Sequence, residues 1–415
     1  MLRVLFFFVI GIILILSSLI LAADSATKLN QLNEMTTIPS EALANNLNFG
    51  WQFIDSSGPK RGGPGFSYDR ILNKLVLCNG EMTGTELIQD TWEWNLNEWQ
   101  FVTYDGPGPR ANFLMVYDDA RQNSILFGGW THPDSYLGDT WIWDGLSWSL
   151  RDVPAPSPRA NCAFAYDIGR QRVVLFGGSY YQTIFNETWE WDGTSWELRS
   201  SEGPPPRIFP RMAYDAKRGK CVLFGGQSSY DGETFGDTWE WDGYNWVQID
   251  VQGPEARLWH MMANDPIREK VLLYGGVNRF DPADIFYNDT WEFDGISWSK
   301  VVGTGLGSRW DAGMTFHEGL GKIVLYGGAG PGPLSGFPVY GDMWVYPGFI
   351  CGDADGNGVI NLLDITYIIN FLYKNGSAPK PPAAGDANGN GATNISDITY
   401  LINFLYKQGL SPVCP

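Results

Sequence analysis

The chain has 415 residues, a formal net charge of −18, 50 glycines and 19 tryptophans, and only 18% of its residues are charged. This length predicts several domains or a repeat array with an appendage. Because acidic residues outnumber basic ones, the composition argues against a protein that binds the phosphates of nucleic acid. Many glycines and aromatics with few charges favour short strands and tight turns in an all-β fold.

The N-terminus is predicted to be an export signal followed by a flexible leader. A single charge, Arg3, precedes an apolar run from Val4 to Ala23, which is typical of a signal peptide over residues 1–23. The run lies at the border between a cleaved signal and an uncleaved membrane anchor, and both remain open. Residues 24–48 are polar and unpatterned. We therefore expect a secreted or cell-surface protein, with no membrane span unless the signal is retained.

Residues 49–348 contain six copies of one unit. Four markers recur in register, and the glycine doublets among them follow one another at intervals of 48 to 52 residues. Glycine doublets begin at Gly128, Gly177, Gly225, Gly275 and Gly327, after a degenerate copy at Asn79-Gly80. A first set of tryptophans follows at Trp92, Trp141, Trp189, Trp239, Trp291 and Trp344, and a second at Trp99, Trp148, Trp196, Trp246 and Trp298. An arginine precedes each copy: Arg61, Arg110, Arg159, Arg207, Arg257 and Arg309.

Each copy is predicted to form four short strands. In the third copy these are residues 162–166, 172–176, 188–191 and 196–199, with a tight Asp-Gly turn before the last strand. A four-stranded repeat with glycine pairs and tryptophans is typical of a propeller blade. The repeats resemble Kelch repeats, and this resemblance implies a six-bladed β-propeller. The sixth copy lacks its outer strand, and Trp51 lies one repeat length before Trp99, so the N-terminal strand is expected to close the ring.

One face of the propeller is the predicted ligand face. Because strand direction alternates along a blade, the loops between the second and third strands share a face with the connections between blades. The candidates on this face are the six arginines and the aromatic residues Trp130, Tyr136, Tyr181, Tyr230, Phe235, Phe286 and Tyr340. Such aromatics suit a glycan or a protein ligand. In the alternative interpretation, the arginines only pair with the acids Asp90, Asp139, Glu187, Asp237, Asp289 and Asp342 and fix the loops.

Residues 351–415 contain a different duplication, with two calcium-binding loops 33 residues apart. Oxygen-bearing residues occupy loop positions 1, 3, 5, 9 and 12, and position 7 would bind through its carbonyl, as in EF-hand loops. The predicted ligands of two calcium ions are Asp353, Asp355, Asn357, Val359, Asn361 and Asp364, and Asp386, Asn388, Asn390, Ala392, Asn394 and Asp397. Each loop runs into a predicted helix, over residues 364–374 and 397–407.

This loop–helix pair resembles a type I dockerin. The resemblance implies calcium-dependent folding and docking onto a cohesin module of a scaffold protein. Loop positions 10 and 11 are Leu362-Leu363 and Ile395-Ser396, where such dockerins usually carry Ser or Thr. Cys351 and Cys414 bracket the module and are expected to form a disulfide in an exported protein. Cys78, Cys162 and Cys221 lie on predicted strands and are expected to be buried thiols.

These features together predict a secreted, non-catalytic recognition protein, with a propeller that binds carbohydrate or protein and a dockerin that docks onto a cohesin-type scaffold or the cell surface. No catalytic residue is singled out. None of His132, His260 and His317 has a tyrosine neighbour, which disfavours a copper radical oxidase resembling galactose oxidase. The alternatives are a component of extracellular polysaccharide degradation, including a carboxylate-pair hydrolase, and a purely structural, calcium-stabilised surface protein.

Overall fold

The computed structural model describes residues 50–82, 86–132, 135–279, 284–301, 306–332, 337–346, 351–355, 360–379, 382–407, 409–410 and 412. The predicted signal and leader, the calcium ligands Asn357 and Val359, and Cys414 lie outside these residues. No helix in the described part of the chain is long and apolar enough to cross a bilayer.

Six four-stranded antiparallel sheets follow one another along the chain as blades. Blade one consists of β2 (Gly65–Asp69), β3 (Lys74–Cys78), β4 (Thr91–Trp94) and β5 (Trp99–Thr103). Blade two consists of β6 (Leu114–Asp118), β7 (Asn123–Phe127), β10 (Thr140–Trp143) and β11 (Trp148–Arg151). Blade three consists of β12 (Ala163–Asp167), β13 (Arg172–Phe176), β16 (Thr188–Trp191) and β17 (Trp196–Ser200).

The remaining blades repeat this order. Blade four consists of β18 (Arg211–Asp215), β19 (Lys220–Phe224), β20 (Thr238–Trp241) and β21 (Trp246–Ile249). Blade five consists of β22 (Met261–Asp265), β23 (Lys270–Tyr274), β26 (Thr290–Phe293) and β27 (Trp298–Val301). Blade six consists of β28 (Gly313–His317), β29 (Lys322–Tyr326), β30 (Met343–Tyr346) and β1 (Gln52–Asp55).

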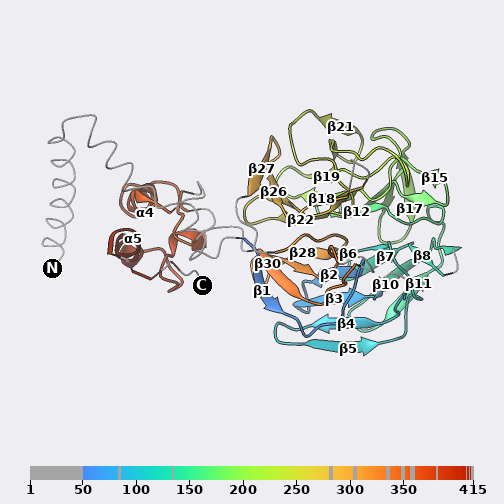
Figure 1. Cartoon of the computed structure of the whole chain (residues 1–415), viewed down its shortest axis with the longest axis horizontal. Helices are drawn as coiled ribbons and strands as arrows, with labels where there is room; N and C mark the ends of the chain where they lie inside the picture. Colours follow the sequence, from blue (N-terminus) through green and yellow to red (C-terminus); the bar gives the residue numbers. More distant parts are fainter. Residues whose placement is uncertain are drawn as a thin grey trace, which may run out of the picture. The chain divides into compact units, whose positions relative to one another are not determined.

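The innermost strands of the blades form a closed ring. Strand β2 contacts β6, and the contacts continue through β12, β18, β22 and β28 back to β2. The sheets are accordingly arranged around a common centre (Figure 1). The predicted six-bladed β-propeller is confirmed, and each strand predicted for the third copy lies within one residue of its observed bounds at either end.

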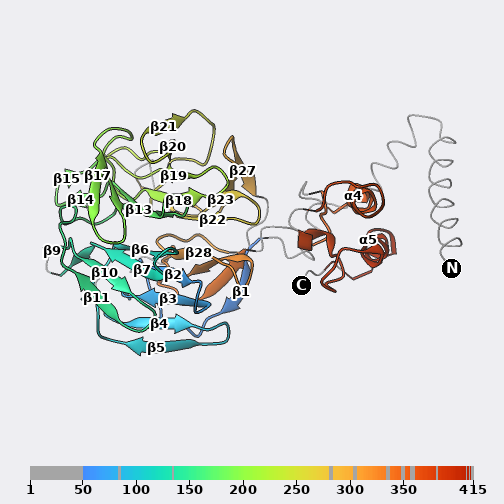
Figure 2. The same cartoon turned by 180° about the vertical axis from the view of Figure 1, so that it is seen from behind.

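Strand β1 closes the ring, as the spacing of Trp51 predicts. It pairs antiparallel with β30, with Gln52 opposite Val345 and Phe53 opposite Trp344. Figure 2 shows the blue strand β1 beside the orange strands of the last blade. The buried Trp51 indole donates its Nε1–H to Thr290 Oγ1 (3.2 Å) and packs edge-on against Tyr274. The N-terminal strand is therefore fastened to blade five as well as to blade six.

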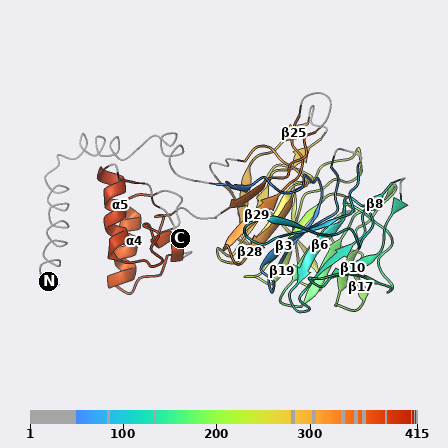
Figure 3. The same ribbon diagram turned by 90° about the horizontal axis from the view of Figure 1, so that it is seen from below.

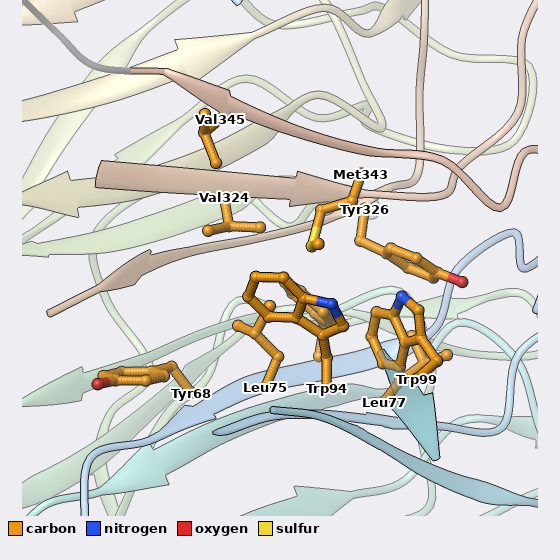
Figure 4. Packing of buried hydrophobic residues seen from close by; sticks show 10 residues of the cluster. Tyr68, Leu75, Leu77, Trp94, Trp99, Val324, Tyr326, Met343 and Val345 are labelled. Carbon is orange, nitrogen blue, oxygen red and sulfur yellow. The ribbon is translucent and has the colours of Figure 1, made fainter. Parts of the chain in front are cut away.

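The core lies between neighbouring blades. The second strands are apolar on both faces because each blade is covered by another on either side. Figure 4 shows one such layer, in which Leu75 and Trp94 of blade one lie near Val324 and Met343 of blade six. The same kind of layer recurs between the other blades.

The glycine doublets allow the backbone of the next blade to approach closely. Gly128 and Gly129 both have positive φ, and the Gly129 N–H donates to Arg159 O of the following blade (2.9 Å). A Cβ on Gly128 would lie 2.5 Å from that same carbonyl oxygen, so a side chain at this position would push the two blades apart. The equivalent bond recurs at every junction between blades, including the one from Gly328 to Arg61 that closes the ring.

The C-terminal region forms two helices, α4 (Leu362–Tyr373) and α5 (Ile395–Lys407), and a short 3-10 helix η1 (Pro382–Gly385). The helices pack against each other (Figure 3). Both begin two residues before the predicted start. In α4 the reason is a capping box, because Asn361 accepts the Leu363 N–H and the Asp364 carboxylate accepts the Asn361 N–H.

Candidate functional site

The six predicted arginines are buried in ion pairs. The Arg207 side chain is fully buried, and its two terminal nitrogens donate to Asp237 Oδ1 (2.6 Å) and Oδ2 (2.9 Å). Its Nη1 also donates to Gly225 O (3.0 Å). The pairs are Arg61–Asp90, Arg110–Asp139, Arg159–Glu187, Arg207–Asp237, Arg257–Asp289 and Arg309–Asp342. The alternative interpretation is therefore the arrangement found, because buried, paired guanidinium groups are not available to a ligand.

Two of the aromatic candidates complete these structural pairs. The Phe235 ring lies 4.2 Å from the Arg207 guanidinium, and the Tyr340 ring lies 4.1 Å from that of Arg309. Burial opposes ionisation of Asp237, but the hydrogen bonds and charge of Arg207 outweigh it and hold the pKa of Asp237 below its usual value. Phe235 and Tyr340 cover the ion pairs and thus have a structural role.

Three other aromatic candidates form an exposed cluster with Tyr180. Tyr136 lies in the hairpin of β8 (Trp130–Thr131) with β9 (Ser135–Tyr136), and Tyr180 and Tyr181 lie in the hairpin of β14 (Ser179–Tyr180) with β15 (Thr183–Ile184). Tyr230 lies in the loop between β19 and β20. The Tyr136 ring lies 5.5 Å from Tyr180 and 5.0 Å from Tyr181. The Tyr136 and Tyr230 hydroxyls are 3.4 Å apart. Because Tyr181 is 50% exposed and Tyr230 is 44% exposed, this tyrosine cluster presents ring faces and hydroxyls to solvent.

Of the remaining candidates, Trp130 lies opposite Tyr136 in the hairpin of β8 and β9, and Phe286 lies in blade five. The half-buried Trp130 packs edge-on against His132 at 4.8 Å. Phe286 belongs to the hairpin of β24 (Val277–Asn278) and β25 (Ile285–Phe286), and it stacks on Trp310 at 5.0 Å. The structure thus distributes the predicted aromatic candidates over separate places and does not gather them into one platform.

A ring of six residues surrounds one end of the central channel. Each lies two positions after a blade arginine, and each has a left-handed backbone, with φ between 52° and 63°. We call this set the mouth ring: Gly63, Asn112, Asn161, Phe209, Trp259 and Asp311. Backbone bonds connect neighbours around it, including Gly63 N–H to Asp311 O (2.8 Å) and Asp311 N–H to Trp259 O (2.9 Å). Left-handed conformations are strained for bulky residues such as Phe209 and Trp259.

Inside the mouth ring lies a cavity of about 310 Å³ along the channel. Its walls combine apolar and polar side chains, and an ion pair crosses it, in which Arg211 Nη2 donates to Asp311 Oδ1 (2.8 Å). Arg211 belongs to blade four and Asp311 to blade six. The pair therefore connects the two blades that lie on either side of blade five. Burial raises the pKa of Asp311 despite the opposing charge of Arg211.

A second carboxylate, Glu81, lies beside Asp311. A Cβ on Gly62 would lie 3.2 Å from Glu81 Cγ, and a Cβ on Gly63 would lie 2.7 Å from Asp311 Oδ2. The two acids therefore flank the same glycine pair. Burial, together with the negative charge of Asp311, raises the pKa of Glu81 to about 7. At neutral pH this carboxyl can either donate or accept a hydrogen bond.

The first calcium loop gathers three carboxylates. The oxygens of Asp353, Asp355 and Asp364 lie within 4.8 Å of one another. Asp364 accepts the N–H groups of Asp355 (3.2 Å) and Asn361 (2.7 Å), at loop positions 3 and 9. Burial raises the pKa of Asp364 to about 7, and the neighbouring acids add to this. Crowded hard oxygen donors with suppressed ionisation fit a calcium ion, whose charge would relieve the repulsion.

The second calcium loop repeats this pattern with fewer acids. Asp397 accepts the N–H groups of Asn388 (3.1 Å) and Asn394 (2.8 Å), again at positions 3 and 9. Asp386 accepts those of Asn390 and Gly391. The predicted ligand Ala392 is described, and its carbonyl accepts the Asn394 side chain (2.7 Å). The amide of Asn388 replaces a carboxylate at position 3, so this loop carries less negative charge than the first.

The first residues of the helices α4 and α5 expose large apolar side chains. Leu362, Leu363 and Ile395 are at least 41% exposed.

The cysteines match their predicted states where they are described. Cys351 is disulfide-bonded, while the strand cysteines Cys78, Cys162 and Cys221 are buried thiols.

Sequence reasoning missed the polar groups of the channel. Arg211, Asp311 and Glu81 were not among the predicted residues, nor were the aromatic members of the mouth ring. A signal was present, because the position two residues after each arginine varies strongly while the surrounding repeat is constant. Recognising this signal requires knowing that the position faces the channel mouth.

The comparisons with known proteins agree with this architecture. Residues 351–406 match the family model described as Dockerin type I domain. The solved structure described as "Structure of YjhT" is similar with a TM-score of 0.57 and 12% identity, over 70% of this chain and 95% of that chain. At this identity the likeness shows the fold alone. No sequence among the curated proteins matches the chain.

The C-terminal region is therefore a dockerin-type module that follows a six-bladed propeller. Dockerin domains bind calcium and imply a cohesin partner, and proteins that contain them are typically extracellular.

Proposed function

We propose that this protein is a secreted recognition protein without catalytic activity, in which a Kelch-type propeller over residues 49–348 binds carbohydrate. The dockerin over residues 351–415 docks it, in the presence of calcium, onto a cohesin-type module of a scaffold or cell surface. The observation that carries the docking half is the dockerin match on two loops with calcium-ligand spacing. Residues 1–23 act as the export signal, and Cys414 is the disulfide partner of Cys351.

Two calcium ions support the docking module, one in each loop, held by the ligands predicted from the sequence. In loop one the donor oxygens of Asp353, Asp355 and Asp364 already lie close together. Loop two offers fewer carboxylates, and ligand charge raises calcium affinity in such loops. Loop one is therefore the tighter site.

The docking surface includes the apolar residues at the start of the two helices. Leu362 and Leu363 are exposed, although burial of such side chains is favourable. The cohesin partner would therefore offer an apolar patch where clostridial cohesins meet Ser and Thr. Titration of the full chain against a panel of cohesin modules, with calcium and then with EDTA, tests this. Binding only with calcium, reduced by Leu363→Ser but not by Tyr244→Ala on a distant propeller turn, is expected. Absence of binding to every cohesin would favour the purely structural alternative.

The carbohydrate half is supported by the exposed tyrosine cluster of Tyr136, Tyr180, Tyr181 and Tyr230. Exposed rings stack on the apolar faces of sugars, while phenol hydroxyls bond to sugar hydroxyls. A glycan array probed with the full chain tests this. Failure to bind any glycan would contradict the proposal and move the search to a protein ligand.

One observation favours the alternative of polysaccharide degradation. Glu81 has a pKa raised to about 7 and lies beside a second carboxylate, Asp311, and hydrolases use such unequal pairs as acid and base. Release of reducing ends from a polysaccharide panel would support this alternative. If Glu81→Gln abolished that release, the assignment would change from recognition to hydrolysis.

A further inference from the structure

The six repeats differ most in chemistry where they meet the channel. At the first position of the innermost strand the blades carry Gly65, Leu114, Ala163, Arg211, Met261 and Gly313. Blade four alone places a charge there. In the mouth ring, blade six alone places an acid, Asp311. The constant positions of the repeat build the blades, so these divergent positions are where one repeat can be specialised without loss of the fold.

The ion pair formed by these two residues is not needed for the propeller architecture. Its members come from blades that are not neighbours, and the equivalent positions elsewhere hold apolar or amide side chains. Burying a pair of charges in the interior of the channel costs desolvation energy that their attraction often fails to recover. Arginine and aspartate occur at these two repeat positions once each among the six repeats, although burying them costs free energy. This pattern indicates a role in recognition.

Aromatic rings lie beside this polar group in the mouth ring. Trp259 is the backbone neighbour of Asp311, and its ring contacts Phe209 at 4.6 Å between centroids. Phe209 in turn meets Tyr230 of the tyrosine cluster at 6.1 Å. The Asn161 amide donates to the Tyr230 hydroxyl (3.0 Å), while its buried Oδ1 has no hydrogen-bond partner among the described residues. One side of the mouth is therefore aromatic and the other carries hydrogen-bonding groups.

We propose that the mouth ring and the channel cavity behind it form the propeller's ligand site, and that its ligand is a neutral saccharide. In this site the end sugar contacts Trp259 with one face and hydrogen-bonds to Asp311, Arg211 and Glu81 with its hydroxyls. The inference rests on the carbohydrate half of the proposed function and assigns its location and ligand class.

The preference for a neutral sugar follows from the charges at the mouth. Asp311 and Glu81 provide two carboxyl groups, and the nearby guanidinium groups are already engaged. That of Arg211 donates to Asp311, and that of Arg279 lies over the Trp259 ring at 4.8 Å. Sugar hydroxyls can donate to carboxylates in charge-assisted bonds. A carboxylate on the ligand would instead meet like charge in a poorly hydrated channel, which is unfavourable. The cavity of about 310 Å³ lies in the size range of small-ligand sites.

Repeat-derived substitutions test the site without introducing foreign residues. Asp311→Asn places there the residue that blades two and three carry at this position, and Arg211→Met copies blade five. Calorimetric titration of the full chain would use cello-, xylo-, manno- and malto-oligosaccharides, with oligogalacturonate as the acidic probe. Tyr244→Ala on an exposed turn between the two outer strands of blade four and Phe337→Ala in the loop of blade six serve as controls. Thermal melting checks that each variant is folded.

We expect the wild type to bind a neutral saccharide, and each mouth variant to lose about tenfold or more in affinity, because each removes a charge-assisted hydrogen bond. Both controls should stay within about twofold. If the wild type binds and both mouth variants bind equally well, the site lies elsewhere, while the proposed function stands. If oligogalacturonate binds as tightly as the neutral sugars, the assigned ligand class is wrong. If the wild type binds no saccharide, the proposed carbohydrate recognition fails together with this site. Should Arg211→Met melt at a much lower temperature, Asp311→Asn decides the result.

Discussion

Replacement of Asp237 by Asn should destabilise the propeller strongly, because it strands a buried cation. The Arg207 guanidinium is fully buried and donates to both carboxylate oxygens of Asp237. Removing one partner of a buried pair costs about 3–5 kcal/mol, since the remaining charge is left without compensation. The Asn amide can still accept one hydrogen bond, which places the expected loss near the lower end, at about 3 kcal/mol.

Differential scanning calorimetry of the full chain measures this effect. At about 2 °C per kcal/mol for a domain of this size, the propeller transition should fall by roughly 6 °C. The matched control is Lys217→Ala, which breaks the exposed ion pair with Glu269 and should shift the transition by less than about 1 °C. A shift for Asp237→Asn no larger than that of the control would refute the reasoning, because the buried arginine would then be hydrated or otherwise balanced.

Three further perturbations probe closure, histidine burial and calcium. Trp51→Ala should lower the free energy of unfolding by about 3–5 kcal/mol in guanidinium denaturation, because it removes a buried indole. Phe53→Ala in the neighbouring strand should cost less than about 1 kcal/mol, because Phe53 is 54% exposed. Equal losses for the two variants would argue against closure by Trp51. Burial lowers the pKa of His317 to about 4, so the folded protein holds this imidazole in its neutral form. Its contribution to the free energy of unfolding is therefore complete above the unfolded pKa of about 6.5 and falls by up to about 3 kcal/mol as pH drops towards 4. His317→Asn, whose amide oxygen can accept the same Leu320 N–H as His317 Nδ1, should therefore lose less stability than the wild type between pH 7 and 4.5; equal losses would assign the pH dependence to other groups. In calorimetric titration with calcium, Asp353→Ala should weaken the tighter of two binding events and Asp386→Ala the weaker one. The double variant should unfold the helices while the propeller melts at the same temperature as in the wild type. A large shift of the propeller transition would contradict independent domains.

The repeats made most of the propeller predictable. Four markers in register define each blade, and the missing outer strand of the sixth copy together with Trp51 indicates how the ring closes. The role of the arginines could not be decided from sequence alone, because an arginine and an acid in every copy are compatible with both a free ligand face and a buried pair. Arg207 and Asp237 are separated by 30 residues, and only the fold brings them into contact.

The candidate ligand site was the least predictable part. Aromatic side chains in loops were easy to find, but Phe235 and Tyr340 cover ion pairs while Trp259, overlooked in the sequence, lies at the channel mouth. Arg211 begins a strand in blade four, and its partner lies 100 residues later. The direction in which a side chain points depends here on a left-handed residue two positions before each innermost strand, a conformation that residues such as Phe209 and Trp259 rarely adopt.

Because β1 pairs with the last blade, the propeller ring can close only late in biosynthesis. Phe53 pairs with Trp344, so 291 residues separate two neighbours that a ribosome releases among the first and the last of the propeller. Until β30 emerges, β1 has an unpaired edge and the pocket of the Trp51 indole lacks the Tyr346 ring. Contacts this distant in sequence form slowly, and exposed edges pair with other chains. A chain truncated before blade six should therefore aggregate rather than accumulate as a five-bladed intermediate, which makes the last blade a checkpoint for the completeness of the whole domain.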